Sequence, residues 1–169
     1  MIRGIHHISL HTHNLERLAS FYGAAFGFVP AAPQMRLDRE PLVDRITGIP
    51  NSILRLQLFE AWNCFVEIIE WEAPAGREVG PLRPNDCGYT HFCVDVTDID
   101  AEYKRLAAVG MSFLNDEPVT VGVIRTVYGR DPDGNIIEIQ QVPDGHVYSL
   151  RDPGRLSPRS DRGSPPEHF

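Results

Sequence analysis

The sequence has no excess of positive charge, no cysteine framework and no long apolar run, and each absence excludes a class of protein. Its formal net charge is −7 and its isoelectric point about 5.4, so it offers no basic stripe for nucleic acid phosphates. Cys64, Cys87 and Cys93 show no CxxC spacing, which argues against a disulfide framework or a thiolate zinc site. No apolar stretch is long enough to span a membrane or to serve as a secretion signal. We therefore expect a reduced, cytoplasmic protein without membrane or nucleic acid partners.

The overall composition is that of an ordinary globular protein. It has 169 residues, of which 42% are hydrophobic and 23% charged. That length suits one domain, or two small modules that share a core.

The order of predicted elements repeats along the chain. A strand near residues 5–12 leads to a helix capped by Asn14, and the stretch "YTHFCVDVTDI" leads to a second helix capped by Asp98. His7 lies seven residues before the first cap, and His91 lies seven residues before the second. The later strands "CFVEIIE" and "NIIEIQQ" each place one glutamate among apolar residues, at Glu67 and Glu138. A unit of strand, helix and strands therefore occurs twice.

The repeat predicts four segments. Residues 1–74 form a first module, 75–87 a linker, 88–142 a second module and 143–169 a tail rich in proline, serine and arginine. Within the first module, residues 30–52 are expected to be a long connection with one helical turn, and they are a candidate lid.

Two histidines and two glutamates thus occupy matching places. If the modules pair about a pseudo-twofold axis, all four side chains face one cavity. Imidazole nitrogens and carboxylate oxygens suit a divalent Zn, Ni, Co, Fe or Mn ion. Four such ligands leave two adjacent coordination positions for substrate oxygens, and a carboxylate that leaves the metal is placed to act as a base. Taken singly, each residue also fits a structural histidine or a solvent-facing glutamate; the repetition favours the metal site.

Several stretches resemble the vicinal oxygen chelate superfamily. They are "HHISLHTHNLERLASFYGAAFGF", "VEIIEW", "THFCVDVTDIDAEYKRLAAVG" and, above all, "GRDPDGNIIEI". The resemblance covers residues 4 to about 142 and implies an α+β fold, in which two tandem βαβββ modules form a cupped mixed sheet around one divalent metal. It places the metal ligands at His7, Glu67, His91 and Glu138. Glu67 or Glu138 is then the catalytic base.

The superfamily's branches leave three functions open. A ligand at Glu67 favours an isomerase, epimerase or lyase that acts on a small oxygenated substrate through a metal-chelated enediolate. In an Fe(II) extradiol dioxygenase the position of Glu67 is not a ligand. A binding protein of the resistance type sequesters a small molecule and needs no metal. A homodimer, with the tail draped over the partner, is expected.

Overall fold

The computed structural model describes residues 2–77 and 80–150. Along the chain its elements are β1 (His7–Thr12), α1 (Leu15–Phe26), β2 (Val29–Pro30), β3 (Met35–Asp38), α2 (Pro41–Thr47), β4 (Ile53–Ala61), β5 (Cys64–Ala73), β6 (His91–Asp95), α3 (Ile99–Ala108), β7 (Ser112–Phe113), β8 (Val119–Val121), β9 (Ile124–Arg130) and β10 (Ile136–Gln141).

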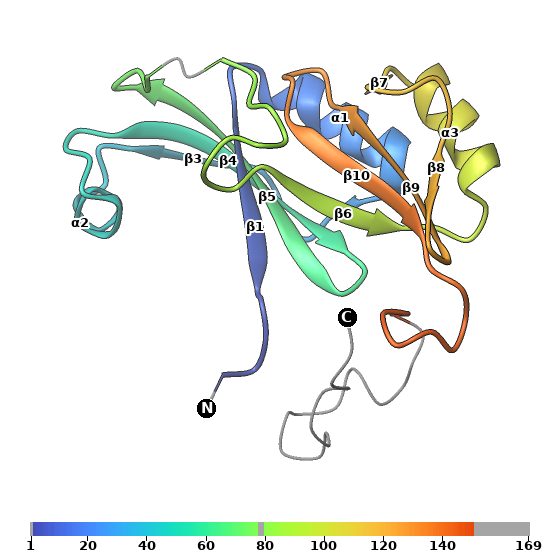
Figure 1. Cartoon of the computed structure of the whole chain (residues 1–169). Coiled ribbons are helices and arrows are strands. Elements are labelled where there is room, and N and C mark those ends of the chain that lie inside the picture. Colours follow the sequence, from blue (N-terminus) through green and yellow to red (C-terminus); the bar gives the residue numbers. More distant parts are fainter. Residues whose placement is uncertain (1, 78–79, 151–169) are drawn as a thin grey trace.

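The strands form two five-stranded sheets with the same plan (Figure 1). The first has the order β1-β5-β4-β2, with β3 also paired to β4. The second has the order β6-β10-β9-β7, with β8 also paired to β9. In each sheet the edge strand that opens the module is parallel to the strand that closes it, and the other pairs are antiparallel. The predicted α+β fold of two repeated modules is confirmed.

Local sequence explains where α1 begins and ends. The side chain of Asn14 accepts a hydrogen bond from the Arg17 backbone N–H, which satisfies one of the free donors of the first turn. Glu70 on β5 accepts a second one, from the Leu15 N–H at 2.9 Å. Gly27 ends the helix in the left-handed conformation, with φ of 67°, which glycine adopts without strain.

The second module starts its helix in the same way. Asp98 accepts from the Ala101 N–H, and Gln141 on β10 accepts from the Ile99 N–H. Gln141 follows Glu138 at the interval at which Glu70 follows Glu67. The duplication therefore extends to the capping contacts that join each helix to the last strand of its module.

The two modules share one hydrophobic core. Helix α1 packs against β4 and β5, and α3 packs against β10. Their buried side chains form a single cluster: Leu15, Leu18, Phe21, Tyr22, Ala25, Phe28, Phe59, Ala61, Val66, Ile68, Ile99, Leu106, Met111, Val127, Ile137 and Ile139. The Tyr22 hydroxyl donates to the buried Asp131 carboxylate at 3.0 Å, and its ring lies 6.2 Å from that of Phe92. The modules thus meet through their helix-covered sides.

The structure departs from the sequence prediction in the 30–52 connection and at β8, and it describes only part of the predicted tail. The 30–52 connection contains the helical turn expected, as α2, but it also contains β3, which pairs with β4 although its charged residues hide the alternation. Strand β8 was not expected. Of the predicted tail, residues 151–169 lie outside the described residues.

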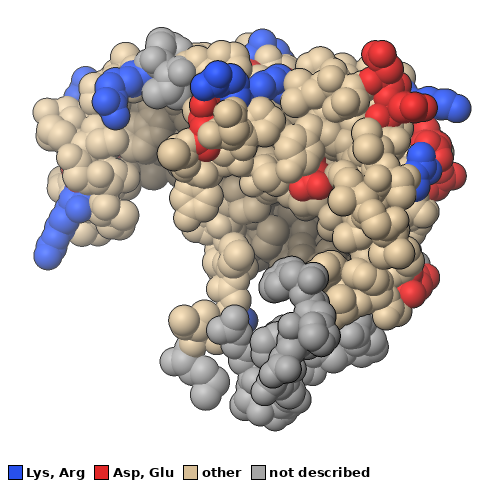
Figure 2. All heavy atoms as spheres, viewed as in Figure 1, with Lys and Arg blue, Asp and Glu red and all other residues tan. Residues whose placement is uncertain are grey.

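Charge is distributed unevenly on the surface. On the face shown in Figure 2, acidic side chains gather at the edge where Figure 1 places α3. Among the described residues, no helix has the length and apolar content needed to cross a membrane.

Candidate functional site

The four predicted ligands lie on the sheet faces that turn away from the shared core. On β5, Glu67 alternates with Val66 and Ile68, which are 1% and 0% exposed. On β10, Glu138 alternates with Ile137 and Ile139, both fully buried. Because successive strand residues point to opposite faces, each glutamate faces outward from the core. We call these outward sides the open faces of the two sheets.

The first open face brings His7 to Glu67. Strands β1 and β5 run parallel, and the His7 Nε2 atom lies 3.8 Å from the Glu67 Oε2 atom. The other ring nitrogen, Nδ1, lies 2.9 Å from Nδ1 of His6. Side chains of His7 and Glu67 are 43% and 21% exposed, so both are accessible from solvent. This pair is the first half-site.

The second open face brings His91 to Glu138. The His91 Nε2 atom lies 3.2 Å from the Glu138 Oε2 atom, and its Nδ1 atom lies 3.0 Å from the Thr90 hydroxyl oxygen. The Thr126 hydroxyl donates to the other Glu138 oxygen at 2.6 Å. The Tyr128 hydroxyl lies 3.4 Å from His91 Nε2. This second half-site is more enclosed, with side chains 28% and 17% exposed.

Two protic groups beside the second half-site are held in their neutral forms. Burial, and then the nearby Glu138 carboxylate, raise the pKa of Tyr128, so the phenol keeps its proton at neutral pH. Burial, with Glu138 and Asp95, also raises the pKa of the Cys93 thiol. A thiolate nucleophile is therefore not favoured at Cys93, and the phenol is available as a hydrogen-bond donor.

The structure assembles each half-site but does not join the two within one chain. Across residues 2–77 and 80–150, no three His, Cys, Asp or Glu side chains converge closely enough to hold a metal ion. The reason lies in the packing, because both half-sites face away from the core that the modules share. A single four-ligand site built from His7, Glu67, His91 and Glu138 therefore stays a prediction.

The donor atoms of each half-site nevertheless fit a divalent metal. Both histidines turn Nε2 toward a carboxylate and place Nδ1 against a neighbouring polar atom, an orientation typical of metal-ligating histidines. Two ligand atoms bound to one zinc-like ion at about 2.1 Å stand roughly 3.0–3.4 Å apart. The 3.2 Å spacing of the second half-site matches that range, and the 3.8 Å spacing of the first is slightly longer.

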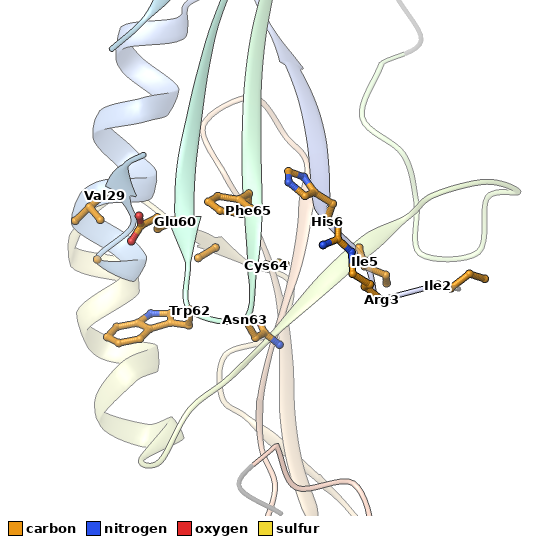
Figure 3. Close-up of a pocket in the computed structure, with 13 residues that line it drawn as sticks. Ile2, Arg3, Ile5, His6, Val29, Glu60, Trp62, Asn63, Cys64 and Phe65 are labelled. Atoms are coloured by element: carbon orange, nitrogen blue, oxygen red, sulfur yellow. The ribbon is translucent and has the colours of Figure 1, made fainter. Parts of the chain in front are cut away.

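A groove of about 1130 Å³ opens near the first half-site (Figure 3). It lies where the segment before β1 meets the hairpin that joins β4 to β5, and it exposes Ile5 and Trp62 to solvent. The His6 ring stacks on Phe65 at its wall, 5.1 Å between centroids. None of the four predicted ligands lines this groove, so it is distinct from the half-sites.

Thr126 and Tyr128 are functional candidates that the sequence analysis did not single out. Both lie on β9, where Tyr128 is the cross-strand partner of Glu138 and Thr126 that of Gln140. The "DPDG" turn joins β9 to β10 and fixes which residues of the two strands lie opposite each other. Counting back from this turn in the sequence would have identified Thr126 and Tyr128 as neighbours of Glu138.

Comparison with known proteins assigns the family. The family model described as the glyoxalase/bleomycin resistance protein/dioxygenase superfamily matches residues 4–139. The chain belongs to this superfamily. A comparison with curated protein sequences found no match.

Solved structures of the same superfamily share the fold. A glyoxalase family protein from Bacillus cereus is 18% identical with a TM-score of 0.73, over 83% of this chain and 94% of that one. A glyoxylase/bleomycin resistance protein/dioxygenase domain from Frankia sp. is 16% identical with a TM-score of 0.62, over 86% and 96%. A mutant fosfomycin resistance protein FosX from Listeria monocytogenes, complexed with Mn(II) and 1S,2S-dihydroxypropylphosphonic acid, is 18% identical with a TM-score of 0.55, over 82% and 90%.

Proposed function

We propose that the protein is a divalent-metal-dependent isomerase, epimerase or lyase that removes a carbon-bound proton from a small substrate with two adjacent oxygen atoms. The observation that carries the proposal is the pair of matching half-sites, His7 with Glu67 and His91 with Glu138. Superfamily membership supports it, since FosX, a protein of similar fold, is complexed with Mn(II) and a compound with two adjacent hydroxyl groups.

Two copies of the chain are needed to complete this site. One half-site supplies only two protein ligands, too few for a catalytic metal centre. β1 and β6 carry His7 and His91, and each is the edge strand of its sheet. In a twofold dimer the first half-site of one copy faces the second half-site of the other, which produces two equal sites. The proposed enzyme is therefore a homodimer.

A divalent cation held by these four ligands would act as a Lewis acid toward the two substrate oxygens. The residues of the chain then divide the remaining work. Thr126 fixes Glu138 by its hydrogen bond, whereas Glu67 contacts His7 and has no hydrogen bond from any described residue. The less restrained Glu67 is the better placed base for the carbon-bound proton. The neutral Tyr128 hydroxyl donates a hydrogen bond to the oxygen on which negative charge develops.

A second candidate is an Fe(II) dioxygenase. The longer spacing in the first half-site favours it, because two histidines and one carboxylate suffice for an Fe(II) oxygenase site and Glu67 then stands off the metal.

Metal analysis followed by two activity assays separates the candidates. The isomerase or lyase proposal predicts one divalent ion per chain, and exchange of solvent deuterium into α-hydroxycarbonyl compounds without oxygen uptake. Glu67→Gln should abolish the exchange, and Glu60→Gln, at an exposed position of the neighbouring strand β4, should leave it intact. Oxygen uptake with catechols identifies the dioxygenase instead. A purified protein that binds none of the tested divalent ions contradicts both.

A further inference from the structure

The open face of the first sheet is apolar beside Glu67. Leu58 on β4 is the cross-strand partner of Glu67, and the next row across the sheet is Ile69, Leu56 and Met35. The row after that is Trp71, Leu54 and Leu37, in which Leu54 is already buried within the chain at 3% exposed. Leu56, Leu58 and Ile69 are only half-buried in the chain. An apolar wall therefore begins at the metal-ligand position and extends away from it.

The second module shows that the fold does not require apolar residues at Leu56, Leu58 and Ile69. The duplication gives each position a counterpart with the same register, because Glu138 corresponds to Glu67. Beside the glutamate the counterparts are polar: Tyr128 for Leu58, Gln140 for Ile69 and Thr126 for Leu56. Further out they are apolar: Val119 for Met35, Ile124 for Leu54 and Val121 for Leu37. Polar side chains at the three positions beside the glutamate are thus compatible with the sheet. The aliphatic side chains of Leu56, Leu58 and Ile69 are therefore explained by something other than the stability of the sheet.

The dimensions of the wall suit part of a small molecule. Each row is two residues further along the strand, a step of about 6.8 Å, so the row of Trp71 lies about 13 Å from that of Glu67. One such step matches an aryl group, and two steps match a medium-length alkyl chain. In the proposed dimer the polar open face of the second module lies opposite this wall.

We propose that the substrate has an apolar part, aromatic or aliphatic, which binds Leu56, Leu58 and Ile69, while its two adjacent oxygens bind at the half-site ligands. The polar open face around Tyr128 contacts the oxygenated end. This inference rests on the proposed function, since it takes the metal ligands as the anchor of the same molecule.

Hydroxamic acids, which chelate metals through two oxygens, test the wall. Binding of acetohydroxamate and of octanohydroxamate to the metal-loaded protein is measured by calorimetry. Octanohydroxamate should bind about 100-fold more tightly, because its chain becomes buried. Leu56→Thr and Ile69→Gln copy the residues of the second module, and each should reduce this ratio about tenfold while the affinity for acetohydroxamate stays unchanged. Val123→Thr, in the exposed turn before β9, is the matched control and should retain the full ratio.

The possible results distinguish the wall from the metal site. If acetohydroxamate binds and the longer chain adds nothing, the apolar-substrate inference is wrong and the proposed function stands. If neither compound binds to the loaded protein, the proposed function fails and the inference fails with it. If Ile69→Gln converts a dimer into a monomer in sedimentation, the wall is a contact between copies, which also overturns the inference.

Discussion

Thr126 illustrates how a single hydroxyl can position a metal ligand. It donates to Glu138 at 2.6 Å and also contacts the Ile139 carbonyl oxygen at 3.1 Å. Thr126→Val keeps the shape of the side chain and removes the donor. We expect metal affinity to fall about tenfold, since loss of such orienting hydrogen bonds costs 10–100-fold in other sites. Calorimetric titration of the metal-free protein with Zn(II) or Mn(II) measures the change in metal affinity.

The matched control for this variant is Thr120→Val. Thr120 is exposed on the adjacent strand β8, where its cross-strand partner is Arg125 and not a residue of either half-site. The Thr120→Val variant should bind metal with the affinity of the unaltered protein. Equal affinities for Thr126→Val and the unaltered protein would mean that the backbone, not the hydroxyl, orients Glu138.

Tyr22 makes a buried polar contact between the first helix and the second module. Its hydroxyl is buried and donates to Asp131, which is 4% exposed and also accepts from the Asn135 side chain. Tyr22→Phe removes one donor from a buried carboxylate and should lower the free energy of unfolding by about 1–3 kcal/mol. Urea denaturation of the two proteins measures this change in the free energy of unfolding. Tyr103→Phe is the control, because it removes a hydrogen bond to the Asn115 carbonyl at the surface. If it lowered the free energy of unfolding as much as Tyr22→Phe does, the argument from burial would be contradicted.

At the scale of elements, α2 is held by one carboxylate. The Asp44 side chain accepts hydrogen bonds from the Ser52 hydroxyl and N–H and from the Asn51 N–H. These contacts, with the Ser52 hydroxyl foremost, lower the pKa of Asp44 from 3.8. A lowered pKa in the folded state means that the stabilising contribution is complete above 3.8 and is lost as the pH falls through the folded value.

Amide hydrogen exchange should report this loss directly. Protection of the Asn51 and Ser52 amides should be high at about pH 6 and should fall as the pH drops below 3.8 and through the lowered pKa of Asp44. Asp44→Ala should lack the protection throughout this pH range. Glu40→Ala should behave as the unaltered protein, because Glu40 occupies the cap position of α2 without a side-chain hydrogen bond. Undiminished protection of the unaltered protein at low pH would exclude Asp44 as the anchor.

The elements that sequence predicted well are those with local signals. Asn14 and Gly27 bound α1, Asp98 starts α3, and the strand glutamates stand out against apolar neighbours. Strand β3 has no such signal, because Arg36 and Asp38 form ion pairs at the edge of the sheet and only pairing with β4 makes the segment a strand. Long-range pairing, not propensity, decides such strands.

At the scale of the whole molecule, the repeat identified the four ligand candidates but not how the modules face each other. The periodicity of each strand says which residues share a face, and this holds for His7 with Glu67 and for His91 with Glu138 in their separate pairs. Which faces adjoin depends on contacts between distant segments, such as Tyr22 with Asp131 and Arg105 with the Ala24 carbonyl. No pattern within one module specifies those contacts, so one cavity per chain and one cavity between chains fit the same sequence.

Complementation between two defective chains decides where the site forms. His7→Ala removes a ligand from the first half-site and His91→Ala removes one from the second, so each variant alone should lose high-affinity metal binding. If sites form between copies, a mixed dimer pairs the intact first half-site of one variant with the intact second half-site of the other, and one of its two sites is whole. Mixing the unfolded chains and refolding them together should therefore restore metal binding to about a quarter of all sites, if the two chains pair at random. A site formed within each chain predicts no restoration, since every chain then carries one damaged half.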